Sequence, residues 1–127
     1  MIRTGTYALY NGNEYRFRRI DDQTIRLISN NKSDTSKGFV HLAENVYTMD
    51  VRVSKIDDLY YIYSDGIYKG NKFGATEGSK GKVLLSTPDA QLAEQYDFDR
   101  TDKYLYSKYV DYSEVEIVEE TKPYSLD

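Results

Sequence analysis

Few side chains in this sequence are suited to catalysis. His41 is the one histidine, the chain has no cysteine, and no serine stands in a nucleophile motif. The histidine lies in the apolar run 39–42, where a packed or edge position in a sheet is expected. No serine or cysteine triad can therefore be assembled, and the thiolate ligands of structural zinc sites are absent.

Carboxylates are plentiful, with 21 acidic residues that could supply the pair a glycoside hydrolase needs. None of them stands in an apolar segment that would raise its pKa to suit an acid catalyst. Asp97, Asp99 and Asp102 have part of the spacing of a calcium loop. The sixth position from Asp97 is Asp102 instead of glycine, and the twelfth is Lys108 instead of glutamate. The sequence therefore predicts a protein that is not an enzyme and that holds no cofactor or metal.

Phosphate and nucleic-acid binding are also disfavoured. The glycines between residues 66 and 81 are spread through a segment that opens no helix, so neither phosphate-binding fingerprint is present. The four arginines between residues 16 and 26 could form a basic stripe on one hairpin. The net charge of −4 and the pI near 5.0 are unlike the basic footprint of nucleic-acid binders, so a solvated outer face is expected there.

Acidic residues and tyrosines gather in the second half of the chain. Residues 1–55 carry nine basic and six acidic side chains, a net charge of +3, whereas residues 56–127 carry eight and fifteen, a net charge of −7. Acid and tyrosine on adjacent strands suit docking to a basic protein surface. An acidic face that only keeps the protein soluble is the alternative. The predicted partner-binding residues are Asp97, Asp99, Asp102, Tyr104, Tyr106, Tyr109, Asp111, Tyr112, Glu114 and Glu116.

The elements that must position these residues are mostly strands. Residues 6–10 and 14–18 alternate on either side of Asn11-Gly12, the dipeptide most typical of a two-residue hairpin turn with positive φ at both positions. With that turn, Tyr10 pairs with Asn13 and Ala8 pairs with Tyr15. The predicted core face of this hairpin consists of Ala8, Tyr10, Tyr15 and Phe17.

Further strands are predicted at residues 24–29, 46–54, 82–86, 103–111 and 114–119, with a slip of alternation near Asp50 that could be a bulge. A second hairpin is expected from strands 59–63 and 67–69 around a turn at 64–66. Segments 30–38, 70–81 and 97–102 are predicted loops, and the chain beyond Thr121 a frayed tail. One helix is predicted at about 88–96, with Thr87 as its N-cap.

The two predicted hairpins resemble each other. Tyr7, Tyr10 and Tyr15 recur 53 residues later as tyrosines 60, 63 and 68, and each copy is followed by a β-rich stretch that ends in serine. Two weakly similar units, at about 4–55 and 56–120, would follow from a duplication. Two independent tyrosine-rich hairpins are the alternative.

Composition indicates a globular, mainly β protein. Of 127 residues, 39% are hydrophobic and 30% charged, and tyrosine, which suits half-buried strands, occurs 14 times. We expect one β-rich domain over residues 1–127, whose meander hairpins form a partly open barrel or a strongly bent antiparallel sheet with one short helix. The lack of cysteine, of a long apolar run and of a signal peptide predicts a cytoplasmic location.

The opening Gly5-Thr6-Tyr7-Ala8-Leu9-Tyr10-Asn11-Gly12-Asn13-Glu14-Tyr15-Arg16-Phe17 resembles the start of small, uncharacterised β-rich proteins of Gram-positive bacteria. Several of these look like immunity partners encoded beside secreted polymorphic toxins. The resemblance covers about 15 residues, is repeated weakly at 60–68, and carries over no functional residue. It implies a cytoplasmic inhibitor that blocks a toxin's active site.

The leading hypothesis is therefore an immunity protein that neutralises a cognate toxin by binding its basic domain, without nucleic acid or membrane. The first alternative is a ligand-binding or structural β-domain of a phage or mobile element, and the second a weakly specific hydrolase. A closed apolar pocket lined by tyrosines would favour ligand binding, whereas polar groups converging in a cleft would favour an enzyme. Partner identity and oligomeric state are not encoded in any motif of the chain.

Overall fold

The computed structural model describes residues 2–125 and is mainly β, with few helical turns and one short helix, as predicted. The helical elements are α1 (Ala90–Gln95) and the 3₁₀ turns η1 (Lys32–Lys37), η2 (Val53–Lys55) and η3 (Tyr112–Glu114). The strands are β1 (Gly5–Tyr10), β2 (Asn13–Arg19), β3 (Thr24–Ser29), β4 (Val40–Ala43), β5 (Val46–Arg52), β6 (Asp58–Tyr68), β7 (Asn71–Glu77), β8 (Lys82–Thr87), β9 (Asp99–Asp102), β10 (Leu105–Asp111) and β11 (Glu116–Pro123).

All the strands belong to one open antiparallel sheet in the hydrogen-bonded order β4-β5-β3-β2-β1-β6-β7-β8-β10-β9, with β11 paired to β6. The chain divides into two compact units. The N-terminal unit consists of Gly5–Ile62 and Thr121–Asp127, and the C-terminal unit of Met1–Thr4 and Tyr63–Glu120. The long strand β6 thus contributes its first half to one unit and its second half to the other.

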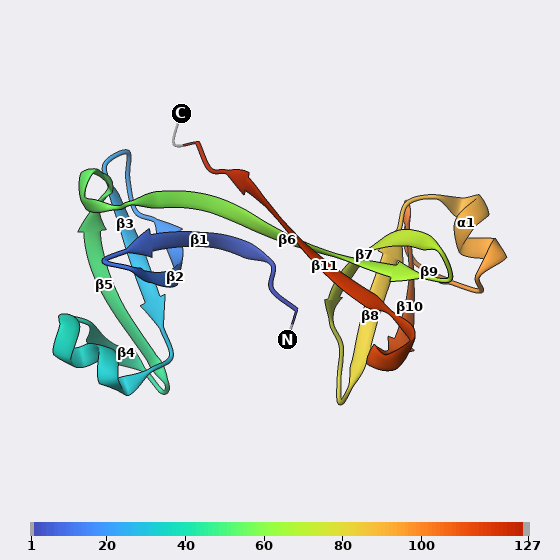
Figure 1. The fold of residues 1–127 in the computed structure, drawn as a ribbon, viewed down its shortest axis with the longest axis horizontal. Helices are drawn as coiled ribbons and strands as arrows, with labels where there is room; N and C mark the ends of the chain where they lie inside the picture. The colour runs from blue at the N-terminus through green and yellow to red at the C-terminus, as the bar shows by residue number, and fades with distance from the viewer. Residues whose placement is uncertain (1, 126–127) are drawn as a thin grey trace. The chain divides into compact units, whose positions relative to one another are not determined.

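The N-terminal unit is built on the predicted hairpin of β1 and β2 (Figure 1). Asn11 and Gly12 both have positive φ, at 49° and 79°, and Ala8 lies opposite Tyr15, as predicted. Its core also takes in Tyr124 from the other end of the chain, whose ring centroid is 5.1 Å from that of Phe17. The buried residues of this core are Ala8, Tyr15, Phe17, Ile25, Leu27, Phe39, Tyr47 and Val51.

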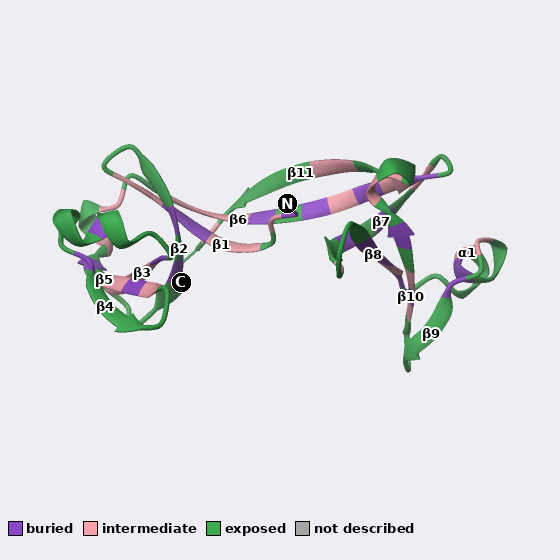
Figure 2. Ribbon diagram, turned by 90° about the horizontal axis from the view of Figure 1, so that it is seen from below, coloured by how far each residue is buried: buried purple, intermediate pink, exposed green. Residues whose placement is uncertain are grey.

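The C-terminal unit has its own core beneath α1, on one face of β7, β8 and β10. The first described residue belongs to it: Ile2 is buried there, and its backbone N–H donates to Glu77 Oε2 at 3.1 Å. Along β8, Val83 and Leu85 are fully buried while Leu84 between them faces the other side of the sheet. Figure 2 colours each strand by the burial of its residues. The buried residues of this core are Ile2, Tyr68, Phe73, Ala75, Val83, Leu85, Ala93, Phe98 and Val110.

The two units repeat one series of elements in the same register. The series β1-β2-β3-η1-β4-β5-η2 corresponds to the second half of β6 followed by β7-β8-α1-β9-β10-η3, at an offset of 58 residues as far as the N-caps Asn31 and Asp89 and of 59 residues from the end of each helical element. Asp97, with a φ of 61°, corresponds to Gly38, with a φ of 103°, since the N–H of each donates to the carbonyl three residues earlier and a buried phenylalanine follows. Matching strand pairs include Ala8↔Tyr15 with Gly66↔Phe73, Phe17↔Leu27 with Ala75↔Leu85, Ile25↔Val51 with Val83↔Val110, and Val40↔Thr48 with Asp99↔Ser107.

This repeat corrects the predicted second hairpin and the 53-residue spacing of tyrosines. Strand β6 runs unbroken through residues 64–66, and the chain turns at Lys69-Gly70, where φ is 48° and 80°. These two residues have the same left-handed pair of conformations as Asn11-Gly12, which is what a two-residue hairpin requires. Gly66 lies within the strand opposite Phe73 instead of in a turn.

Several predicted loops are also wrong. Segment 70–81 contains β7, whose buried Phe73 and Ala75 alternate with polar residues, and segment 97–102 contains β9. Segment 30–38 contains η1 with the buried Asp34, and Thr121–Pro123 extend β11, which begins at Glu116. Helix α1 is capped by Asp89, whose Oδ1 accepts from the N–H of Leu92, instead of by Thr87. The register of β3 with β5 is continuous past Asp50, so the slip there is not a bulge; β5 ends at Arg52, where η2 follows.

The turn at Gly12 gives a test of the fold. A Cβ atom added there would meet nothing within 4 Å, so the cost of Gly12→Val would come from the positive φ alone. We expect this substitution to lower the free energy of unfolding by about 1 kcal/mol or more, because a β-branched side chain resists that conformation. Gly12→Asn should cost less, since asparagine tolerates positive φ. Urea unfolding of the three proteins measures the difference, and equal stability of the valine variant would contradict the turn.

Candidate functional site

All ten predicted partner-binding residues lie in the C-terminal unit, and most of them on β9, β10 and the segments that flank these strands. Strand β9 ends the strand order, and among the described strands it pairs only with β10. One of its edges is therefore open to solvent. Some of the ten residues lie together beside this edge, whereas most of the others form contacts that stabilise the C-terminal unit.

Four of the ten hold the unit together, and a fifth lies apart from the others. Tyr106 and Tyr112 pack, half-buried, against the core, and the Tyr112 hydroxyl also donates to a carboxylate oxygen of Glu77. Asp111 forms an ion pair of 2.5 Å with Lys82 on the neighbouring strand. Glu114 accepts from the backbone N–H of Asp111 in a capping box at η3. Glu116, at the start of β11, is exposed and outside the β9–β10 hairpin.

The pKa values reflect these internal partners. The hydrogen bond from Tyr112, with a second from the N–H of Ile2, lowers the pKa of Glu77, and the same hydroxyl–carboxylate bond raises the pKa of Tyr112. The hydrogen bond to Asp111 raises the pKa of Lys82. The polar atoms of Tyr112 and Asp111 are thus used in contacts within the chain, so these two residues are poor candidates for binding a partner.

The remaining residues form an exposed surface on the outer face of β10 and at its turn from β9. Tyr104 is 73% exposed, Tyr109 61%, and between them Leu105 39%. Tyr104 sits in the β9–β10 turn with Asp102, whose Oδ1 accepts from the N–H of Lys103. Residues 107 and 109 share one face of β10 because side chains alternate along a strand, while Val110 on the other face is buried in the core. Leu105 precedes a register shift in the pairing with β9 and lines the same pocket as Tyr109 and the buried Ser107.

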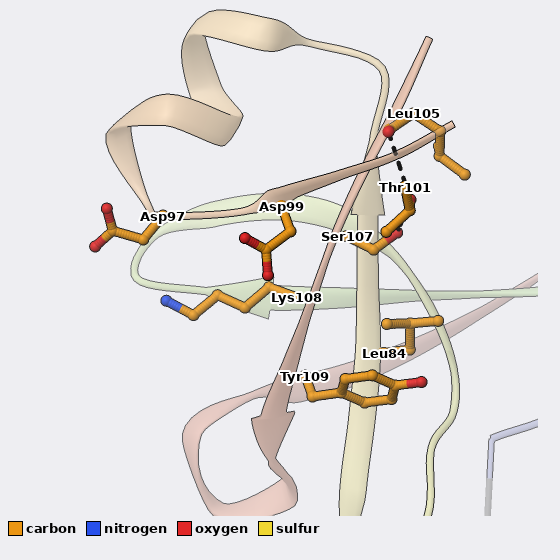
Figure 3. Close-up of a pocket in the computed structure, with 8 residues that line it drawn as sticks. All are labelled: Leu84, Asp97, Asp99, Thr101, Leu105, Ser107, Lys108 and Tyr109. Carbon is orange, nitrogen blue, oxygen red and sulfur yellow. Dashed lines mark hydrogen bonds between the residues drawn. The ribbon is translucent and has the colours of Figure 1, made fainter. Parts of the chain in front are cut away.

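This outer face is hollowed into a pocket of about 560 Å³, shown in Figure 3. Three of the predicted residues line it, namely Asp97, Asp99 and Tyr109. The other lining residues, which the sequence did not single out, are Leu84, Thr101, Leu105, Ser107 and Lys108. A period-2 reading of a strand at 99–102 would have placed Asp99 and Thr101 on one face, but the acidic composition of that segment concealed the strand.

The pocket has a polar end and also apolar lining residues (Figure 3). Asp97 and Asp99 lie at the polar end, which the Lys108 side chain also reaches while its Nζ donates to the Tyr96 carbonyl at 2.8 Å. The hydroxyls of Thr101 and Ser107 are 3.0 Å apart in the middle.

The apolar lining residues lie on both sides of the Thr101 and Ser107 hydroxyls, with Leu84 and Tyr109 on one side and Leu105 on the other (Figure 3). The pocket thus combines two carboxylates with an aliphatic and aromatic wall. That arrangement suits a cationic side chain with an apolar stem.

Charge around the pocket is less one-sided than the sequence suggests. Residues 97–109 contain three acidic and three basic residues, so this segment has no net charge. The guanidinium of Arg100 is turned to the β9–β10 hairpin, where it donates to the carbonyls of Asp102 and Lys103. None of the ion pairs formed between described residues involves Asp97, Asp99 or Asp102. The C-terminal unit as a whole holds eight basic and twelve acidic residues, a net −4, whereas the N-terminal unit holds nine of each.

Catalytic and metal centres have little support elsewhere in the described residues. His41 is exposed on the edge strand β4, with its ring centroid 5.1 Å from that of Tyr47. Within residues 2–125, no three histidine, cysteine or carboxylate side chains are grouped so that they could hold a metal ion. No helix among these residues has the length and apolar character needed to cross a membrane.

Two tyrosines on β10 test which face of the strand packs on the core and which is exposed for binding. Tyr109→Ala should change the free energy of unfolding by no more than about 0.5 kcal/mol, because the ring is mostly in solvent. Tyr106→Ala, on the opposite face of β10, should lower the free energy of unfolding by on the order of 2 kcal/mol, because that ring packs on the core. Thermal or urea unfolding of the two variants tests the assignment of the faces, and equal losses of stability would contradict it.

The comparisons with known proteins bear on the chain as a whole. No curated protein and no solved structure matches it. A family model does match, over residues 2–126, which takes in both units of the fold. On this evidence the chain belongs to the family described as uncharacterised conserved protein UCP033725.

Proposed function

We propose that this chain binds another protein through the outer face of β9 and β10 and acts as an inhibitor of the immunity type, which neutralises a cognate bacterial toxin in the cytoplasm. The observation that carries the proposal is the exposed group of Tyr104, Leu105 and Tyr109 beside a pocket with two carboxylates. Tyrosine is enriched at protein interfaces because its ring offers a large contact area at a small cost in conformational entropy.

The charge of the C-terminal unit supports a basic partner. A net charge of −4 confined to one unit gives that unit a field that attracts a positive protein surface and accelerates encounter. An inhibitor needs no catalytic group, cofactor or metal of its own. The same acidic field disfavours nucleic acid and anionic membranes as partners.

The pocket also supports a second candidate, a ligand-binding β-domain without enzymatic activity. Its volume of about 560 Å³ is within the range of small-molecule sites, which are of about 300–1,000 Å³. The pocket is open on the outer face of the sheet instead of enclosed by tyrosines, and Tyr109 is the one tyrosine among its lining residues. Protein binding is therefore the better supported of the two.

The experiment that tests the proposal measures binding to the product of the neighbouring gene over a salt series. Wild type should bind more slowly as salt rises, because screening weakens attraction between opposite charges. Charge reversal of Asp97, Asp99 and Asp102 to lysine should slow association further, roughly tenfold, without unfolding the protein. A matched triple reversal on the N-terminal unit, at the exposed Asp22, Glu44 and Asp58, should slow it much less.

A wild type that does not bind this product or inhibit its activity would contradict the proposed function. Binding that ignores salt and both triple variants would remove the electrostatic part of it and leave the acidic surface as a solubilising face.

His41 gives an independent test of the view that no catalysis is involved. The ring is exposed and contacts Tyr47 within the N-terminal unit. His41→Ala should therefore leave inhibition of the partner unchanged within about twofold, a change of less than about 0.5 kcal/mol. Abolished inhibition at an unchanged melting temperature would instead indicate a catalytic role for the imidazole.

A further inference from the structure

The pocket on the outer face of β9 and β10 has a counterpart in the N-terminal unit, because the two units share one register. By the offsets of 58 and 59 residues, Leu84 corresponds to Arg26 and Tyr109 to Asp50. Both pairs are directly opposite each other on neighbouring strands. The same two places in the sheet are therefore occupied by different chemistry in the two units.

In the N-terminal unit, the chain itself places an arginine on this face. Arg26 donates from Nε to Asp50 Oδ1 at 2.7 Å and from its NH2 nitrogen to Oδ2 at 3.1 Å, a two-pronged ion pair. The bond lowers the pKa of Asp50 and raises that of Arg26. The outer face of this kind of sheet accommodates a guanidinium that is held by a carboxylate on the neighbouring strand.

In the C-terminal unit, that arginine is missing and carboxylates without an ion-pair partner are present. Leu84 and Tyr109 leave a hollow where Arg26 and Asp50 would meet, and Asp97 and Asp99 supply acid at its end. The counterpart of Asp97 is Gly38, so the N-terminal unit has no carboxylate at the equivalent point. The position of Asp99 is held by Val40 in the N-terminal unit.

We propose that this pocket receives an arginine side chain of the protein partner. The inference rests on the proposed function, which supplies the partner. The aliphatic stem of the arginine lies against Leu84, its guanidinium faces Asp97 and Asp99, and the Tyr109 ring borders the site as a stacking surface.

The polar end retains an attraction for a cation despite the presence of Lys108. Two carboxylates and one ammonium leave one net negative charge, and the ammonium already donates to the Tyr96 carbonyl and lies 5.7 Å from the centroid of the Tyr68 ring. Arginine suits the site better than lysine, because its planar guanidinium binds carboxylates in two-pronged fashion, stacks on aromatic rings and is less strongly hydrated.

The first arm of the test uses a probe in place of the partner. Backbone amide NMR shifts of the ¹⁵N-labelled full-length chain are followed on addition of N-acetyl-arginine amide and of N-acetyl-citrulline amide, its neutral isostere. Arginine should shift the amides of Thr101, Ser107 and Tyr109, with citrulline at least roughly tenfold weaker. Equal effects of the two probes, or shifts elsewhere in the chain only, would overturn the proposal.

The second arm uses two double variants. Leu84→Arg with Tyr109→Asp rebuilds in the C-terminal unit the ion pair that the N-terminal unit already holds, so the variant should fold and fill the pocket from within. Asp97→Asn with Asp99→Asn removes the charge and keeps the shape. Each should reduce arginine binding and partner affinity by roughly tenfold or more. The matched control is Asp22→Asn with Glu44→Gln, two exposed carboxylates of the N-terminal unit, which should bind like wild type.

The outcomes separate this inference from the proposed function. Tight partner binding by wild type and by both pocket variants would overturn the arginine site while the inhibitor function stands. No partner binding by wild type, together with arginine-specific shifts that both variants abolish, would overturn the inhibitor function and support the pocket's selectivity. If Leu84→Arg/Tyr109→Asp has a lower melting temperature than wild type and Asp97→Asn/Asp99→Asn does not, the binding measured with Asp97→Asn/Asp99→Asn decides.

Discussion

Alternation of side chains across an antiparallel sheet is the constraint on which both units depend. One face of each strand must be buried, as Val83 and Leu85 are, and a slip of one residue would turn every side chain of the strand to the wrong side. The burial of this one face fixes the register of the sheet. The opposite face is free to vary, because what it carries does not decide whether the strand pairs correctly.

The repeat shows how far that freedom goes. The inner positions keep their character between the units: Ile25 corresponds to Val83, Leu27 to Leu85 and Phe39 to Phe98, and all of them are buried. The outer positions differ in kind, with an ion pair in one unit and a leucine and a tyrosine in the other. A second copy of a stable sheet can thus change its surface chemistry without a new fold, since hydrophobic burial and surface recognition act on opposite faces.

The parts of this fold that could be predicted from the sequence are those with a local signal. Asn11-Gly12 identified the first hairpin and its register because few other dipeptides tolerate two positive φ values. The second turn was missed because Asp65-Gly66 is the more typical turn pair, whereas Lys69-Gly70 adopts the conformation. Strands β7 and β9 were missed because glycine and aspartate mask their alternation, and pairing with β8 and β10 overrides that composition.

The site shows the same division. Asp97, Asp99 and Tyr109 could be predicted from the clustering of acidic residues and tyrosines in the sequence. Leu84 and Ser107 join them only through the pairing of β8, β10 and β9, which no local pattern reveals. Tyr106 and Tyr112 have the same composition signal as Tyr109 and face the core instead. Residue type could not separate these roles, because the side of a strand that faces the core depends on long-range packing.

The termini of the chain have a consequence for how the protein acquires its structure. Ile2 is buried in the core of the C-terminal unit, and Tyr124 packs on Phe17 in the N-terminal unit. During synthesis at roughly 5–20 residues per second, the first residues must therefore wait on the order of seconds for their partners to emerge. The N-terminal hairpin can form early from local contacts, but the core of the N-terminal unit lacks Tyr124 until the whole C-terminal unit has been made. Contacts of such long sequence separation slow folding, so the nascent chain exposes unfinished sheet edges for longer than a protein of local topology would.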